Sequence, residues 1–238
     1  MYQKSLSGKN CLVTGASGGI GKEIAKLLVE NNCNVILTGK TKDKIEKLND
    51  ELKLINQNNV KIDFFPADIS KIEDITKLIS FVNNLFPSID ILINCAGVFP
   101  ISSLQNASLE DFENCFNLNI KAPFILSKEF TKNMMEKQWG RIINIGSSSS
   151  YDGFKDTSIY CASKHALLGL SRSMFDELKK FNVRTFCISP SSVKTDMAKV
   201  LTKQDFSTFI EPKEVADIII FVISFDNEMI PEEIRLNR

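Results

Sequence analysis

The sequence predicts a single α/β domain in which helices cover both faces of a doubly wound, parallel sheet of about seven strands. Short apolar runs alternate along the chain with longer amphipathic runs, an order typical of strands joined by helical crossovers. The apolar runs are nearly continuous in Val, Ile and Leu, which suits strands buried on both faces. No linker, low-complexity tract or internal repeat interrupts this order, so residues 1–238 are expected to form one domain.

Seven apolar runs are the expected strands, and they lie at residues 11–15, 34–39, 60–66, 89–97, 141–147, 182–189 and, more weakly, 232–238. The first helix is expected from about Ile20, after the first strand. The residues "SKIE" at 70–73 have the pattern of a capping box and predict a helix to about Leu85. Further helices are expected from "SLED" at 108–111, from about Thr157 or Ser158, and over 212–224.

Composition excludes several classes of function. Lys+Arg and Asp+Glu are equal at 29 each, so no net charge recruits nucleic acid or an anionic membrane. The longest apolar run, 218–223, is far shorter than the roughly 20 residues that span a bilayer, and no signal peptide is expected. The six cysteines form no C-x-x-C and His165 is the single histidine, so we expect no metal site and a cytoplasmic protein with reduced thiols.

A glycine-rich turn follows the first strand in "TGASGGIGKEIA", which begins at Thr14. In a doubly wound sheet this turn binds a pyrophosphate, because glycines let the backbone approach the phosphates and the next helix presents its N–H groups. The alternative is a flexible turn without a ligand. The flanking strand and helix favour a dinucleotide site, with these contacts expected: Gly15, Ser17, Gly19, Ile20 and Gly21.

The spacing Tyr-x-x-x-Lys occurs twice, at Tyr151–Lys155 and at Tyr160–Lys164. A lysine near a tyrosine lowers the phenol's pKa and makes it a better acid or base, but residues four apart face each other only on a helix. The first pair encloses Gly153 and lacks apolar periodicity, so we expect a loop there. The second pair starts a periodic segment, which makes Tyr160 and Lys164 the chemical pair rather than a surface pair.

The glycine spacing T-G-x-x-x-G-x-G, with Ser147 thirteen residues before Tyr160, resembles the short-chain dehydrogenase/reductase family. The resemblance runs from about Leu6 to Arg238 and is strongest to 3-oxoacyl-acyl-carrier-protein reductases and related carbonyl reductases. It implies a Rossmann domain that transfers a hydride between a nicotinamide cofactor and a ketone or secondary alcohol. Ser147 would hold the substrate oxygen, Tyr160 would transfer the proton, and Lys164 would lower the tyrosine pKa and bind the nicotinamide ribose.

The resemblance implies a fourth catalytic residue, Asn119 in "NLNIKAPF", with Asn117 as the poorer match. Pro123 stands four residues later and has no N–H, so the carbonyl of Asn119 loses its α-helical partner. We expect an interrupted helix here, whose freed carbonyl holds a water near Lys164.

NADP is the expected cofactor. NAD enzymes usually place an acid at the end of the second strand, but this chain has Gly39 and Lys40 there. Lys40 would bind a 2′-phosphate, unless it is only a solvated loop lysine. The resemblance also implies that Asp68 binds the adenine, and capping near Ser70 is the equal alternative.

The motif "NCAG" matches the family's N-N-A-G, and it adds Asn94 and Gly97 to the expected cofactor residues, with Cys95 replacing the second Asn. The family's contacts to the carboxamide and pyrophosphate fall on Val193 and Thr195. Ser191 and Phe186 depart from the family's pattern, which puts local loop geometry in doubt.

A short substrate lid is expected around 196–211, with a turn or two of helix. Such a lid suggests an open, permissive site or a bulky substrate, and no residue in it identifies that substrate. A homodimer or homotetramer is expected from the resemblance. Two alternatives are an NAD-dependent alcohol dehydrogenase of sugar or steroid type and a cofactor sensor without turnover.

Overall fold

The computed structural model describes residues 5–201 and 204–238, and within these ranges seven strands form one all-parallel sheet in the order β3-β2-β1-β4-β5-β6-β7. The strands are β1 (Asn10–Thr14), β2 (Asn34–Gly39), β3 (Ile62–Pro66), β4 (Ile91–Asn94), β5 (Gly140–Ile145), β6 (Val183–Pro190) and β7 (Glu233–Leu236). The predicted fold class is confirmed. Four predicted strands are longer than the observed ones, by one to five residues, because the apolar runs extend into the turns.

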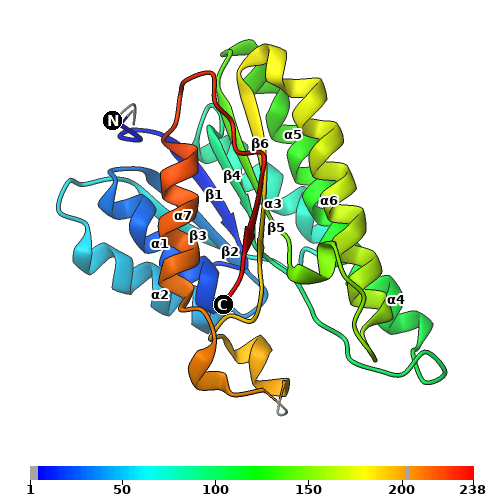
Figure 1. Ribbon diagram of the computed structural model, residues 1–238. Helices are drawn as coiled ribbons and strands as arrows, with labels where there is room; N and C mark the ends of the chain where they lie inside the picture. Colours follow the sequence, from blue (N-terminus) through cyan, green and yellow to red (C-terminus); the bar gives the residue numbers. More distant parts are fainter. Residues whose placement is uncertain (1–4, 202–203) are drawn as a thin grey trace.

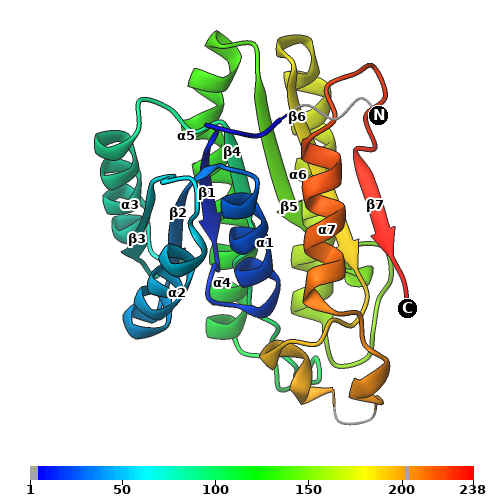
Figure 2. The ribbon, with the colours of Figure 1, turned by 90° about the vertical axis from the view of Figure 1, so that its left-hand side faces the viewer.

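The helices pack on both faces of the sheet (Figures 1 and 2). Helices α1 (Gly19–Glu30), α2 (Lys42–Ile55) and α7 (Pro212–Ile223) share one apolar core with the sheet. On the other face lie α3 (Ile72–Leu85), α5 (Ala122–Glu136) and α6 (Ser158–Leu178). Helix α4 (Leu109–Phe116) precedes α5, and none of the helices in the described part of the chain combines the length and apolarity needed to cross a bilayer.

The predicted capping box at Ser70 is wrong. Helix α3 begins at Ile72 with Lys71 as its N-cap, and Ser70 instead donates its hydroxyl to Asp68 Oδ1 at 2.6 Å. The predicted start of α6 is confirmed, because Thr157 is its N-cap residue, although the Thr157 side chain makes no capping bond and donates to the carbonyl of Phe154 at 2.9 Å.

The predicted interruption at Asn119 is a π-helical turn, η1 (Asn117–Lys121), between α4 and α5. The N–H of Ala122 donates to the carbonyl of Asn117, five residues earlier. Pro123 follows in the first turn of α5, where its missing N–H is tolerated. At the start of α4, Ser108 is the N-cap and accepts a bond from Asp111 N at 3.0 Å.

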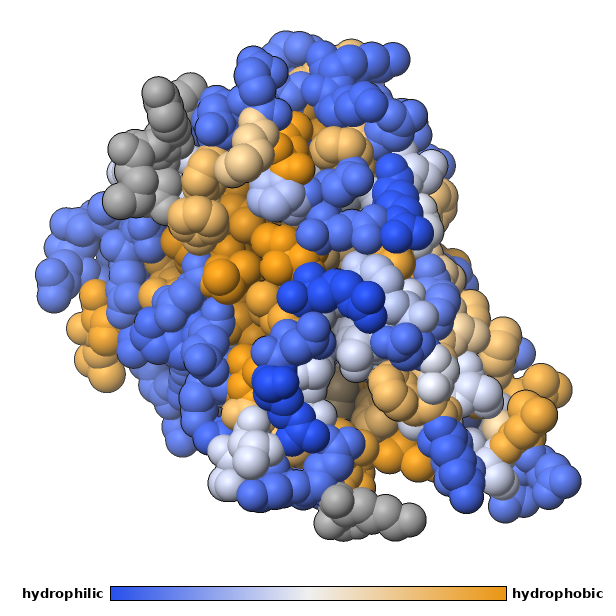
Figure 3. Space-filling model, in the orientation of Figure 1, coloured by the Kyte–Doolittle hydropathy of each residue, from blue (hydrophilic) through white to orange (hydrophobic). Residues whose placement is uncertain are grey.

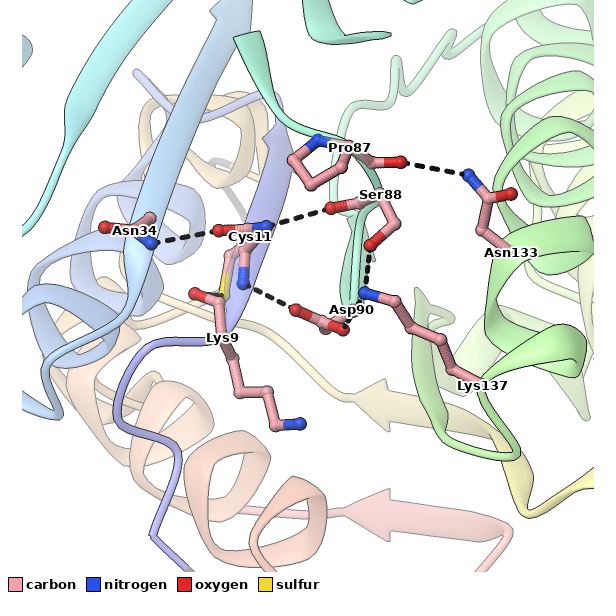
Figure 4. Close-up of polar contacts among 9 residues, drawn as sticks. Lys9, Cys11, Asn34, Pro87, Ser88, Asp90, Asn133 and Lys137 are labelled. Carbon is pink, nitrogen blue, oxygen red and sulfur yellow. Dashed lines mark hydrogen bonds and ion pairs between the residues drawn. The ribbon is translucent and has the colours of Figure 1, made fainter.

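A polar network holds the amino ends of several strands in place (Figure 4). Asn10, the first residue of β1, donates through its N–H to Asp90 Oδ2 at 2.9 Å and through its side chain to Ser88 O at 3.0 Å. Asn34, the first residue of β2, donates to Asn10 Oδ1 at 2.9 Å. These bonds fix the starts of three neighbouring strands, and so align their carboxyl ends.

Candidate active site

A cavity of about 950 Å³ runs along the carboxyl ends of the parallel strands. Figure 3 shows a recess in the lower half of the face that carries β7, with apolar and strongly hydrophilic side chains at its rim. The predicted site residues that line the cavity are Gly15, Ser17, Gly19, Ile20, Gly21, Lys40, Asp68, Gly97, Ser147, Tyr160, Lys164, Val193 and Thr195. Asn94 and Asn119 do not line it.

The glycine turn has the geometry of a phosphate cradle. Gly15 has a φ of +61°, and a Cβ there would lie 2.7 Å from the Cα of Ala96 in the neighbouring loop. A Cβ on Gly21 would lie 2.3 Å from the carbonyl oxygen of Gly15, so α1 packs directly against the turn. The first N–H groups of α1 and the Ser17 hydroxyl are donors suited to a pyrophosphate. These residues fit a nicotinamide dinucleotide.

Lys40 and Asp68 form an ion pair at the β2 side of the cavity. Lys40 Nζ lies 3.0 Å from Asp68 Oδ2, and Asp68 Oδ1 accepts the hydroxyl of Ser70. The Ser70 and Lys40 bonds outweigh the effect of burial and lower the pKa of Asp68. Asp68 therefore stays ionised, and its ion pair holds Lys40 at this side of the cavity.

Tyr160 and Lys164 share one face of α6, as predicted, and Ser147 reaches them from the turn after β5. The Tyr160 hydroxyl makes a hydrogen bond with Ser147. Lys164 Nζ donates to the carbonyl of Ile145 at 2.7 Å and lies 5.6 Å from the centre of the Tyr160 ring. The rival pair separates as expected: Tyr151 lies in the loop and donates to Glu233 Oε2 at 3.2 Å.

The pKa of Tyr160 moves opposite to the prediction. Burial raises it to about 12, and the hydrogen bond with Ser147 offsets only part of that rise. Burial also lowers the pKa of Lys164, whose ammonium is held by a carbonyl rather than by the phenol. The expectation of an acidic tyrosine fails here because desolvation is the dominant effect. Tyr160 is thus a fully protonated group at neutral pH.

Asn119 is buried, and its side chain joins three segments. Its amide donates to the carbonyl of Val98 at 3.1 Å and accepts the Val98 N–H at 3.0 Å. The same amide donates to Ser163 Oγ at 3.0 Å, and Ser163 donates to the carbonyl of Tyr160 at 2.8 Å. Asn119 therefore fixes the loop after β4 against the helix that carries Tyr160. Asn117, the rival position, accepts only a 3.4 Å bond from Lys121.

Asn94 has a different environment from the one predicted. Its side chain donates to Asn144 Oδ1 at 2.9 Å and to Ser127 Oγ at 3.4 Å, which ties β4 to β5 and α5. Asn94 thus supports the sheet from within, because its side chain points away from the edge where the cavity lies. Its neighbour Cys95 does line the cavity, and burial raises the pKa of that thiol to about 12.

The segment after β6 closes one side of the cavity. Val193 pairs with Ile210 in a short parallel bridge, and Thr195 Cγ2 would lie 2.8 Å from a Cβ on Gly19. The expected lid contains two short 3-10 turns, η4 (Asp196–Val200) and η5 (Phe206–Thr208), and its residues 202–203 lie outside the described residues.

Sequence reasoning missed several cavity residues. Phe99 packs edge-on against Tyr160, with ring centres 4.5 Å apart, and it follows the "NCAG" motif directly enough to have been found. Ser163 does not line the cavity, but it supports Tyr160 from three residues further along α6, so helical spacing could have linked the two. Arg238 lines the cavity from beyond β7, and no sequence pattern indicates that position.

Comparison with known proteins gives one consistent result. The sequence profile of the family described as short chain dehydrogenase matches residues 9–205. A 3-oxoacyl-[acyl-carrier-protein] reductase of Rickettsia felis is 33% identical over 228 residues, covering 92% of this chain and 90% of the relative. An uncharacterized oxidoreductase of Staphylococcus aureus is 32% identical over 219 residues, covering 92% of each chain.

Solved structures with the same fold cover nearly the whole chain. A metagenomic short-chain oxidoreductase in complex with NADP has a TM-score of 0.86 at 28% identity and covers 98% of each chain. A putative NAD(P)-dependent gluconate 5-dehydrogenase of Beutenbergia cavernae with bound NADP has a TM-score of 0.88 at 25% identity, covering 98% of this chain and 96% of that one.

Proposed function

The chain belongs to the short chain dehydrogenase family and is an NAD(P)-dependent oxidoreductase, and from this premise we propose that it interconverts a ketone and a secondary alcohol with NADP(H). One observation carries the proposal: Ser147, Tyr160 and Lys164 line the same cavity as the glycine turn. The substrate is a 3-oxoacyl compound or a related carbonyl compound, as for the reductase from Rickettsia felis that this chain resembles.

Tyr160 is the proton donor in this mechanism. A nicotinamide held at the glycine turn would supply a hydride for the carbonyl carbon, and the carbonyl oxygen would then need a proton. Tyr160, protonated at neutral pH, then gives its phenolic proton to that oxygen.

Ser147 is the residue that orients the carbonyl. Its Oγ accepts the N–H of Ser149 at 3.1 Å, and its hydroxyl hydrogen, which faces Tyr160, would turn to the substrate oxygen when a ketone enters. A donor aimed at an oxygen that gains negative charge stabilises the transition state.

Lys164 and Asn119 serve the proton supply. Lys164 uses one of its three N–H donors on Ile145, and the other two are available to a ribose and a water. Asn119 positions α6 through Ser163 and carries the carbonyl from which Pro123 withholds an α-helical partner.

Lys40 supports the preference for NADP. It stands at the end of β2, in the place where an acid would bind a ribose hydroxyl, and Lys44 lines the same part of the cavity. No acid stands at the end of β2 itself, and these two cations suit a 2′-phosphate, with Lys40 shared between that group and Asp68. Val193 and Thr195 would contact the nicotinamide end, and Asp68 holds Lys40 in place.

The same proposal covers the domain organisation, the oligomeric state and the cellular compartment. We assign residues 1–238 to one catalytic domain with a short lid at 196–211. We propose a homodimer or homotetramer, supported by large apolar side chains that are exposed on α4 and α5, such as Phe112 and Phe124. Six free cysteines suit the reducing cytoplasm. Light scattering during size-exclusion chromatography checks the assembly.

A panel of ketones tests the function, with NADPH and NADH offered in parallel and oxidation of the cofactor followed by absorbance. Turnover of at least one ketone, faster with NADPH, is the expected result. Faster turnover with NADH would instead favour the NAD-dependent alcohol dehydrogenase. Cofactor binding without turnover of any ketone or alcohol would favour a sensor and contradict the proposal.

A further inference from the structure

The acidic side chains around the cavity are paired with basic ones, whereas several of the basic side chains have no acidic partner among the described residues. Each acidic side chain that lines it within the described ranges has a basic partner: Asp68 with Lys40 at 3.0 Å, Asp152 with Arg235 at 3.1 Å, and Asp196 with Lys199 at 2.7 Å. Three of the basic side chains that line it, Lys44, Lys155 and Arg238, form no ion pair with a described residue. The cavity therefore has an excess of positive charge, and part of it lies far from the dinucleotide.

Arg238 is the cation that is fixed in position. Its guanidinium donates to Thr208 Oγ1 at 2.6 Å and to Gln204 Oε1 at 2.8 Å, and it lies over the ring of Phe209 at 5.0 Å. Both acceptors are neutral, so they orient the group without cancelling its charge. A guanidinium has five N–H donors, and only two are used by described residues.

The nearby acid Asp205 does not bond to Arg238. Its carboxylate is engaged by the N–H and hydroxyl of Ser207 at 2.9 and 2.7 Å, and its pKa is lowered mainly by these bonds, with a smaller effect of Arg238. The ionised Asp205 offsets part of the arginine's charge, but it leaves the remaining N–H donors of the guanidinium to an anion that enters the cavity.

Sheet topology separates Arg238 from the phosphates of the cofactor. Arg238 follows β7, whereas the glycine turn follows β1 and Lys40 follows β2. At about 4.8 Å per strand, these places lie roughly 19 and 24 Å from the β7 end. Ser147 follows β5, only two strands away, which is roughly 10 Å. Along the sheet Arg238 is thus nearer to Ser147 than to the glycine turn, which favours an anion attached to the substrate.

The lining between these points is largely apolar. Phe99 packs on Tyr160, and Phe154, Met197 and Leu201 line the same cavity. Phe154 and Met197 are half exposed, at 50% and 44%, so they have apolar surface left to cover. A short hydrocarbon spacer fits this lining better than a polyhydroxylated one.

We propose that Arg238 forms an anion subsite of the substrate site, and that the substrate is a ketone joined by an apolar spacer to a carboxylate or phosphate group. Lys155, on the loop between β5 and α6, adds to the positive field at the cavity. The proposal rests on the proposed function, because it assigns a substrate class to the same site.

Binding tests the subsite without turnover. We would titrate hexanoate, hexyl phosphate and the neutral hexanamide into the full chain saturated with NADP⁺, by calorimetry. Wild type should bind at least one anion about fivefold more tightly than the amide, and salt should weaken that preference. Whichever anion binds more tightly identifies the source of the charge. In Arg238→Gln the preference should vanish, and Arg238→Lys should restore part of it.

Arg172→Gln is the matched control, because it removes the same charge from an exposed arginine that pairs with Glu233 and does not line the cavity. The control should keep the wild-type preference. Equal binding of anions and amide by wild type, or an equal loss in both glutamine variants, overturns the subsite.

Kinetics separate this proposal from the proposed function. A 4-oxo acid and its methyl ester are compared as substrates, and Arg238→Gln should raise KM about fivefold for the acid only. An equal effect on acid and ester assigns Arg238 to the structure of the lid and overturns the subsite alone. Reduction of neither compound nor any other ketone by wild type overturns the proposed function, while the calorimetric result still decides the anion subsite.

Discussion

Polar groups stand at both ends of the parallel strands, but they are used in opposite ways. At the amino ends of the strands, side chains bond to one another and to the backbone (Figure 4), as in the contacts of Asn10 with Asp90 and Ser88. At the carboxyl ends, Tyr160, Lys164 and Arg238 keep donors that no described residue uses fully. The groups at the amino ends fix the strands, and those at the carboxyl ends are available to a ligand.

Arginines show the contrast most clearly. Arg141, the second residue of β5, is fully buried and donates to Asp226 Oδ1 at 2.9 Å and to the carbonyls of Asn182 and Phe225 at 3.1 Å. Arg238, beyond β7, is exposed and bonds only to neutral side chains. The same side chain therefore stabilises the fold at one edge and is available for recognition at the other.

The largest expected effect comes from a substitution that acts only at the carboxyl ends of the strands. Tyr160→Phe should lower kcat by about a thousandfold, because it removes the proton donor and little else. The melting temperature and the affinity for NADPH should stay close to the wild-type values, since the ring still packs on Phe99. Steady-state kinetics and cofactor titration check this, and residual activity above a tenth of wild type would contradict the role of Tyr160.

A substitution at the amino ends of the strands should lower the stability of the fold and leave the activity unchanged. Arg141→Met should lower the free energy of unfolding by about 3 kcal/mol, because Asp226 would lose a buried partner. Activity per folded molecule should be unchanged. Urea denaturation measures the loss, and Arg141→Lys, which keeps a cation beside Asp226, should lose less stability than Arg141→Met. Equal losses in the two variants would show that the ion pair is not the cause.

A pH titration tests whether burial controls the ionisation of Tyr160. A pKa raised from 10 to about 12 means that the folded chain holds this proton more tightly than the unfolded chain. The resulting stabilisation is complete below pH 10 and is lost as the pH rises towards 12. Tyrosinate absorbance at pH 10.5 should therefore be the same in wild type and Tyr160→Phe, without cofactor. An excess of one tyrosinate in wild type would mean that burial does not dominate.

The smallest expected effect concerns cofactor choice. Lys40→Ala should lower the ratio of kcat/KM for NADPH over NADH by about fivefold, since the side chain is 78% exposed and water screens its charge. Lys42→Ala, two residues further on, does not touch the cavity and is the control. A loss that is equal for both cofactors would point to a role of Lys40 other than binding a 2′-phosphate.

Much of this arrangement could be predicted from the sequence. Apolar periodicity gave the order of strands and helices, and the spacing of Tyr160 and Lys164 has meaning only on a helix, which α6 supplies. The missing N–H of Pro123 predicted the interruption that the π turn represents. Such inferences succeed because they depend on the local geometry of the chain.

Long-range contacts account for the failures. The pKa of Tyr160 depends on burial against residues far away in the chain, such as Phe99, so a neighbouring lysine could not predict its direction. Asn94 lies in a matching motif, yet its bonds go to Asn144 and Ser127 on other elements. Arg238 is near the substrate site only because β7 is the last strand of the sheet.

The π turn at Asn117–Lys121 has one further consequence, for how this chain tolerates change. An additional residue per turn offsets the helix phase by about 100° between α4 and α5. Removing any one residue in that stretch would rewind it into regular helix and swing Asn119 away from Val98 and Ser163. The alignment of the proton path is therefore encoded in chain length at this point, and losing a residue there does more harm than exchanging one.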